Sequence, residues 1–95
     1  MTNKEAYQQK LEAKLDEWQA EIEKLRAKAQ GAAADYQTNY NEQIQELESK
    51  RDDAKQKLSE LRQAGEGAWE DMKIGIEKAW NDLGDAVNTA KSKFG

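Results

Sequence analysis

The chain has 95 residues and contains no cysteine, no histidine and no proline. The lack of cysteine excludes disulfides, thiolate nucleophiles and thiolate metal sites. The lack of histidine removes the commonest general base and the usual imidazole metal ligand. Together these absences argue against most enzyme classes, and we expect a protein with no catalytic residues, no cofactor and no bound metal.

No run of 18 apolar residues occurs in the sequence, so no segment is expected to span a bilayer. The first residues, Met1–Glu5, lack the apolar core of a signal peptide, and we expect a cytoplasmic protein. The net charge is −4, with both signs interspersed along the chain. Because there is no basic patch, we expect no nucleic-acid binding, and anionic membranes are unattractive partners.

The most regular feature of the sequence is a line of apolar residues spaced three and four apart. This spacing places one narrow apolar stripe along a helix and is typical of a coiled coil. In the first two thirds of the chain the stripe comprises Leu11, Leu15, Trp18, Ile22, Leu25, Ala29, Tyr36, Tyr40, Ile44, Leu47, Ala54, Leu58 and Leu61. Intrahelical ion pairs are expected between Glu46 and Lys50 and between Asp53 and Lys57.

Gly31 is the ambiguous position in this first part. A turn there would give three helices of similar length in an up-down-up bundle reminiscent of a spectrin repeat. Alternatively, one helix runs from about residue 3 to about residue 63, and this is the arrangement we expect. Three alanines follow Gly31, and one interior glycine costs a helix only about 1 kcal/mol relative to alanine.

The clear break comes at residues 64–67, where Gly65 and Gly67 predict a turn. A second helix is expected over about 68–93, folding back on the first. Its apolar stripe is wider and comprises Trp69, Met72, Ile76, Ala79, Trp80, Leu83, Val87, Ala90 and Phe94, with Ile74 and Ala86 at its flanks. Gly75 and Gly84 lie on roughly the same side and would either allow close helix packing or loosen this helix.

The two expected helices differ in length by more than a factor of two. At 1.5 Å per residue, a helix of sixty residues is about 90 Å long and the returning helix about 39 Å. Most of the apolar stripe would then need cover from another chain. We therefore predict an all-α single domain that forms a coiled-coil or helical-bundle homo-oligomer, with a protein client as a possible further partner.

The candidate functional residues are those of the apolar stripe, read as a helix-packing surface. The three tryptophans also suit a binding hot spot, but their spacing alone accounts for them as core residues. Adjacent acidic residues occur at 16–17, 52–53 and 70–71. Neighbours on a helix point about 100° apart, so we assign these carboxylates to a solvated face rather than to catalysis or metal binding.

Several segments of the chain resemble a family of small bacterial coiled-coil proteins that are catalogued as hypothetical or as stress-response proteins. The segments that carry the likeness are Lys10–Trp18, Ile22–Leu25, Gln43–Leu47, Lys50–Ala54, Ala68–Lys73 and Ala79–Trp80. The resemblance implies a cytosolic bacterial protein with a continuous first helix and a role in stress. It supplies no catalytic residues.

From these observations we expect a non-enzymatic, self-associating coiled-coil scaffold or binding protein. The alternative is a reversible membrane-surface protein that acts through the amphipathic helix over 68–94, whose tryptophans and isoleucines lie on one side.

Overall fold

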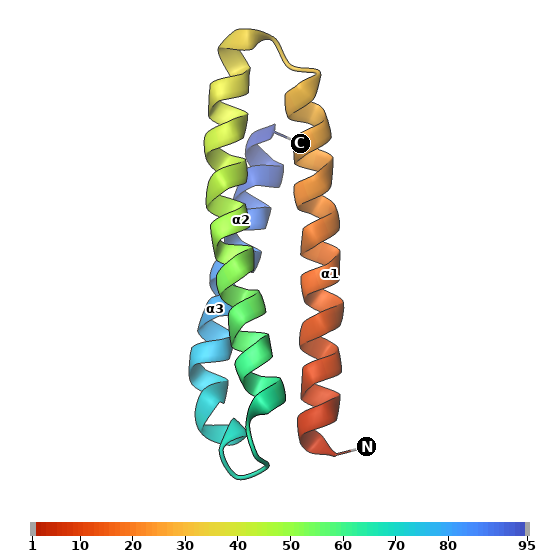
Figure 1. Ribbon diagram of the computed structural model, residues 1–95. Helices are drawn as coiled ribbons and strands as arrows, with labels where there is room; N and C mark the ends of the chain where they lie inside the picture. Colours follow the sequence, from red (N-terminus) through yellow and green to blue (C-terminus); the bar gives the residue numbers. More distant parts are fainter. Residues whose placement is uncertain (1, 95) are drawn as a thin grey trace.

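Each apolar stripe of the chain belongs to a helix that packs lengthwise against two others. The computed structural model describes residues 2–94, in which α1 spans Asn3–Gln30, α2 spans Ala34–Gln63 and α3 spans Trp69–Phe94 (Figure 1). The chain runs up, down and up, so that α3 lies parallel to α1. The rod measures 51 × 20 × 19 Å. The expected all-α bundle is confirmed.

The continuous helix expected over residues 3–63 is not formed, because the chain turns at residues 31–33. The up-down-up bundle, which was the alternative, is the observed arrangement. The turn does not depend on a left-handed glycine, since Gly31 has φ −91° and ψ −2°. Its physical reason is long-range. Folding back lets α1 and α2 bury each other's stripe, and that burial outweighs the small local preference for helix.

The remaining helix ends follow the sequence signals closely. The side chain of Thr2 accepts a hydrogen bond from the Glu5 amide at 3.2 Å and caps α1. The Lys4 ammonium of α1 donates to the carbonyl of Arg62 at 3.3 Å and to that of Ala64, so it satisfies acceptors at the end of α2. The start of α3 lies one residue after the expected position.

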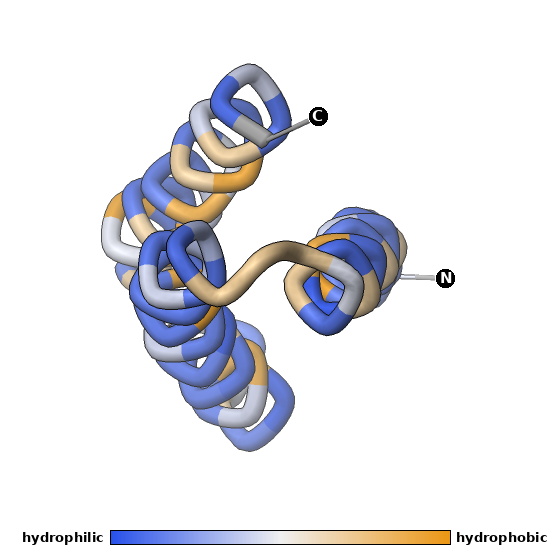
Figure 2. The backbone as a smooth tube through the Cα atoms, turned by 90° about the horizontal axis from the view of Figure 1, so that it is seen from above, coloured by the Kyte–Doolittle hydropathy of each residue, from blue (hydrophilic) through white to orange (hydrophobic). Residues whose placement is uncertain are grey.

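The core is a single column of apolar side chains along the axis of the bundle. Viewed down the rod, hydrophobic positions recur along each helix and face the space between the helices (Figure 2). The buried residues are Leu11, Leu15, Ile22, Leu25, Ala29, Ile44, Leu47, Ala54, Leu58, Leu61, Trp69, Ile76, Trp80, Leu83, Val87 and Ala90. The chain therefore covers its own stripe, and an uncovered stripe no longer requires a second copy. A homo-oligomer remains a prediction that needs other grounds.

The other described side chains of the expected stripe and its flanks have different surroundings. The half-buried side chains that pack against the core are Trp18, Tyr40, Met72, Ala79 and Ala86. Tyr36 is 63% exposed, contrary to its expected place in the stripe. It lies in the first turn of α2, just past the last residue of α1, where little of the bundle faces it. Ile74 is 83% exposed on α3. The side chain of Phe94 lies outside the described residues.

Two contacts fix α3 against α1. The indole N–H of Trp80 donates to the backbone carbonyl of Leu11 at 3.2 Å in a buried position. Four residues further along α3, Gly84 lies under the indole of Trp18, so that a Cβ built at Gly84 would be 2.9 Å from Cζ2 of that ring. Gly84 therefore allows the close helix packing considered for both glycines. Gly75 does not, because a Cβ there would meet nothing within 4 Å.

Replacing each of these two glycines by alanine should have opposite effects. Gly84→Ala forces the rigid Trp18 ring to move, and we expect a net loss of about 1 kcal/mol after the gain in helix propensity. Gly75→Ala is the matched control and should raise the free energy of unfolding by about 0.5–1 kcal/mol. Urea unfolding followed by circular dichroism measures both. Equal stabilisation by the two substitutions would contradict the described packing of Trp18.

The start of α2 can be improved by a better cap. Ala33 holds the N-cap position with φ −62° and ψ 154°, but its side chain accepts no hydrogen bond. Ala33→Asp adds a carboxylate that can accept from the first amides of α2 and interact with the helix dipole. The midpoint of thermal unfolding should rise, corresponding to about 1 kcal/mol. Ala33→Leu, which cannot cap, serves as the control, and an equal rise there would refute the capping explanation.

Candidate functional site

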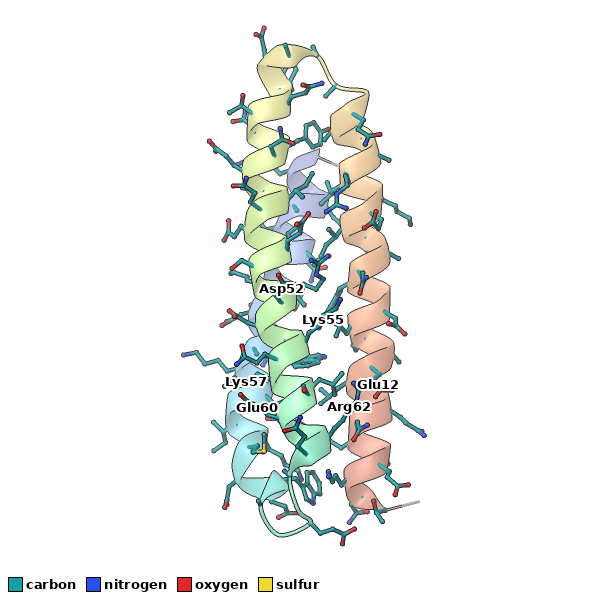
Figure 3. The ribbon with its side chains drawn as sticks, in the orientation of Figure 1. Glu12, Asp52, Lys55, Lys57, Glu60 and Arg62 are labelled. Carbon is teal, nitrogen blue, oxygen red and sulfur yellow. The ribbon has the colours of Figure 1, made fainter. Side chains whose placement is uncertain are left out.

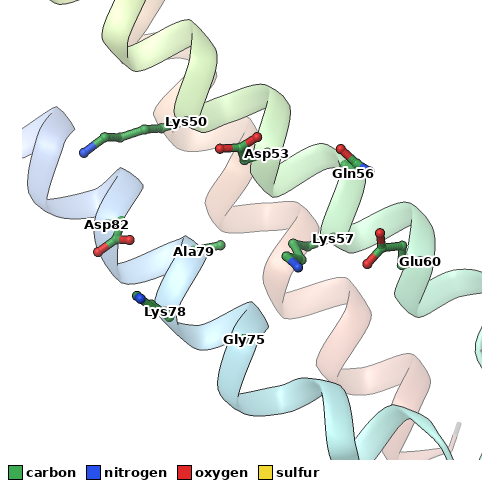
Figure 4. Close-up of a pocket in the computed structure, with 9 residues that line it drawn as sticks. All are labelled: Lys50, Asp53, Gln56, Lys57, Glu60, Gly75, Lys78, Ala79 and Asp82. Atoms are coloured by element: carbon green, nitrogen blue, oxygen red, sulfur yellow. The ribbon is translucent and has the colours of Figure 1, made fainter.

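A groove of about 470 Å³ runs along the outer surface between α2 and α3. Its floor includes Gly75 and the half-buried Ala79, and it is wide at Gly75 because no side chain fills the space there. Its rim is almost entirely charged (Figure 4). The lining residues are Lys50, Asp53, Gln56, Lys57 and Glu60 from α2, and Gly75, Lys78, Ala79 and Asp82 from α3.

Few charged side chains of this groove form ion pairs, whereas charged side chains at the other two helix–helix interfaces do. Arg62 of α2 bridges to Glu12 of α1 at 2.6 Å, and Arg26 of α1 pairs with Glu48 of α2. Lys91 of α3 lies 3.8 Å from Glu21 of α1. Within residues 2–94, by contrast, no ion pair joins α2 to α3.

The groove side chains themselves confirm the difference. Among the residues that the structure describes, Lys50 pairs only with Glu46 on its own helix, at 3.6 Å, as the sequence predicted. The pair expected between Asp53 and Lys57 is not formed, and in the described part of the chain neither residue makes an ion pair. Figure 3 shows Arg62 facing Glu12 across the α1–α2 groove, whereas Lys57 and Glu60 lie on the opposite side of α2.

The charged residues that α2 contributes to the groove are spaced like a helix-packing stripe. Lys50, Asp53, Lys57 and Glu60 are separated by three, four and three residues, and their signs alternate. Such spacing keeps them on one face of α2, beside the stripe that enters the core. The face can therefore lie along another helix over three turns.

Of the described residues predicted as the packing stripe, only Ala79 lines this groove. The stripe residues form the core, and the sequence reasoning missed the groove. The signal was present in the charge spacing of α2, but only the placement of α3 shows that this particular face borders a hollow. The adjacent acidic residues at 16–17, 52–53 and 70–71 are all exposed. Among residues 2–94, no cluster of three or more candidate ligands could hold a metal ion.

A second group of interacting side chains, formed by Tyr7, Trp69 and Lys73, lies at one end of the bundle. The rings of Tyr7 and Trp69 are 5.6 Å apart at an angle of 41°, and the ammonium of Lys73 lies 4.4 Å from the Trp69 ring centroid. These distances suit a cation–π contact, worth about 0.5–1 kcal/mol at an exposed site. Tyr7 was not singled out from the sequence, although it lies one turn before Leu11 and extends the stripe.

The Tyr7 hydroxyl has an unfavourable environment for ionisation. Its oxygen is buried and has no hydrogen bond of regular geometry within residues 2–94. Burial raises the pKa of Tyr7 above its usual value, and the nearby carboxylate of Glu77 raises it further. In the α1–α2 groove the effect is reversed, because hydrogen bonds from Arg62 and Gln8 lower the pKa of Glu12. Neither Tyr7 nor Glu12 lines the α2–α3 groove, so we assign both residues a structural role.

Comparison of the chain with protein-family models, with curated proteins and with solved structures gave no significant match. Within residues 2–94, no helix is both long enough and apolar enough to cross a membrane. The groove therefore has to be interpreted from its own geometry and charge.

Tyr7→Phe should change the alkaline stability of the protein. Because the folded state raises the pKa above 10.0, it favours the protonated phenol, and this contribution is complete below pH 10 and lost as the pH rises through the folded pKa. The unfolding free energy of the wild type should therefore fall more steeply above pH 10 than that of Tyr7→Phe. At pH 7 the variant should be as stable or about 1 kcal/mol more stable, since a buried hydroxyl is removed.

Denaturant titrations at pH 7 and at pH 10.5 and above, on wild type and variant, measure this difference. Tyr36→Phe is the control, because that side chain is exposed. Parallel alkaline profiles for the wild type and Tyr7→Phe would contradict the described burial.

Proposed function

We propose that this protein is a non-enzymatic, self-associating helical scaffold, and that the α2–α3 groove is its contact surface with a second copy. The observation that carries the proposal is the charge pattern of the groove face of α2. Reading Lys50, Asp53, Lys57 and Glu60 in the opposite direction reverses every sign. The face is therefore complementary to itself when two copies of α2 lie antiparallel.

The expected contacts between the two copies of α2 follow when the two-fold axis lies at the level of residue 55 of each copy. In an antiparallel pair centred there, Lys50 lies opposite Glu60 of the second copy, and Asp53 lies opposite its Lys57. Two-fold symmetry repeats both contacts and gives four ion pairs. The open floor at Gly75 leaves room for the approach of a second helix. Charged residues that flank a helix stripe commonly select partner and orientation in coiled coils.

The association is expected to be weak and sensitive to salt. Each solvent-exposed ion pair contributes about 0.2–1 kcal/mol, and salt screens it. A reversible scaffold fits this better than a permanent dimer. A client helix with the same alternation of charge would compete for the groove. The connection with bacterial stress rests on the sequence resemblance alone, and the cytoplasmic location likewise stays a prediction.

The alternative as a membrane-surface protein has less support from the geometry. The residues of α3 that would enter a lipid surface, above all Trp69 and Trp80, are buried in the bundle. Membrane binding would require α3 to leave α1 and α2. Of the large apolar residues described on α3, only Ile74 is strongly exposed, and one side chain gives little membrane affinity.

Charge variants of α2 test the proposed surface. Sedimentation equilibrium of the wild type at low salt should show a monomer–dimer equilibrium that shifts to monomer as salt is added. Lys57→Glu places like charges opposite each other at Asp53 and should weaken the dimer about tenfold or more. The double variant Asp53→Lys, Lys57→Glu exchanges the two signs and should restore association.

Lys55→Glu is the matched control, because Lys55 undergoes the same change in charge but lies on the α1 side of the same helix. It should leave the equilibrium nearly unchanged. A monomeric wild type at low salt, or equal weakening by Lys55→Glu and Lys57→Glu, would refute the groove as the contact surface.

A further inference from the structure

The connection between α1 and α2 is short and conformationally ordinary. Only residues 31–33 separate the two helices. Gly31 is near the helical region, and no non-glycine or glycine residue among those described has a positive φ. Ala33 has a helical φ of −62°. Its ψ of 154° is the torsion that departs from the helical value. A small number of torsions therefore separates this turn from a continuous helix.

At the turn the Gln37 side chain donates to the carbonyl of Ala32 at 3.1 Å, but the first amides of α2 have no side-chain cap. The amides of Gly31 and Ala32 donate to Lys28 and Ala29 at 3.2 Å, which closes α1 with short-range bonds. At the start of α2, Ala33 offers no side-chain acceptor to the first amides. A continuous helix would give these groups regular i to i−4 partners. Alanine, which fills positions 32–34, is also the strongest helix former.

The apolar spacing continues through the turn as though it were helical. Ala29, Ala32, Tyr36, Tyr40 and Ile44 follow one another at intervals of three, four, four and four residues. On a continuous helix they would share one face, with a single stutter. In the folded-back form Ala29 and Ile44 are buried and Tyr40 packs against the core, whereas Tyr36 is 63% exposed. The sequence therefore supports two arrangements of the same segment.

We infer that two copies of this chain can exchange α1 by straightening residues 31–33. In the exchanged dimer, α1 and α2 form one helix of about 90 Å, and α1 of each copy packs against α2 and α3 of the other. The contacts of the closed bundle are retained, but between copies. They include the bond from Trp80 to Leu11, the bridge from Arg62 to Glu12 and the packing of Trp18 on Gly84.

Because the packing contacts are the same in both forms, the hinge and the protein concentration decide between them. The exchanged form gains helical hydrogen bonds at the hinge and places Tyr36 where the two long helices meet. The closed form gains the entropy of two separate molecules. The exchange does not use the α2–α3 groove, which remains on the outer surface in both forms.

Two hinge substitutions should shift the equilibrium in opposite directions. Gly31→Ala favours the continuous helix and causes no clash, since the nearest atom to an added Cβ is 3.8 Å away. Because Gly31 is already near helical torsions in the closed turn, the gain is smaller than the full difference in helix propensity, and the dimer association constant should rise by less than about thirtyfold. Ala33→Pro fits the closed turn, where φ is −62°, but interrupts a continuous helix, so its dimer should fall below detection.

Cross-linking identifies which chain supplies α1. Glu12→Cys and Arg62→Cys are introduced into a chain without other thiols, at positions that face each other between α1 and α2. The proteins are refolded at high concentration, treated with a short bis-maleimide and separated on a denaturing gel. A closed bundle is linked within one chain, and an exchanged bundle is linked between chains. Each single-cysteine protein serves as a control for accidental links.

The expected result is a covalent dimer that increases in the order Ala33→Pro, wild type, Gly31→Ala. It should persist at high salt and in the Lys57→Glu background, which separates it from association through the groove. Monomers alone in all three proteins would overturn the inference. So would a dimer that forms without covalent linkage between chains, or one that Ala33→Pro and Gly31→Ala populate equally.

Discussion

The structure depends on the need to cover a narrow apolar stripe along its whole length. The three helices contain 28, 30 and 26 residues, which correspond to about 42, 45 and 39 Å. Their near-equal lengths let each stripe lie against the other two from one end of the rod to the other. Among the described residues no polar or charged residue is buried, and within the core the indole N–H of Trp80 donates to the Leu11 carbonyl. The charged residues are left to determine the properties of the outer surface.

Much of the core could be predicted from residue spacing, because a heptad pattern requires only local sequence. Ile22, Leu47 and Ile76 are almost fully buried, and each belongs to a stripe that is visible in the sequence. Whether the chain turns at Gly31 or continues as a helix could not be predicted in this way. The local preference there is about 1 kcal/mol, and it is overridden by packing between residues far apart in the chain. Tyr36 shows the same limitation, since its exposure follows from the turn.

The candidate site was less accessible to sequence reasoning than the core. The charged stripe on α2 looks like any solvated helix face until the position of α3 is known. Likewise, Gly75 and Gly84 are indistinguishable in the sequence, yet one opens a groove and the other lies against Trp18. Distinguishing them requires the axial alignment of α3 with α1, which no single helix encodes. The ion pairs that join α1 to both neighbours, and the lack of any described between α2 and α3, give the rod one chemically distinct side.

The packing of Trp18 on Gly84 has a consequence for this alignment. A stripe that repeats every seven residues looks nearly the same after a slide of about 10.5 Å, so apolar packing alone tolerates shifted neighbours. The contact between Trp18 and Gly84 does not, because a slide of one heptad would put Glu77 or Lys91 in the place of Gly84, and a side chain would then occupy the space that the indole needs. The contact between one tryptophan and one glycine therefore selects a single axial position of α3 among several that apolar packing alone would accept.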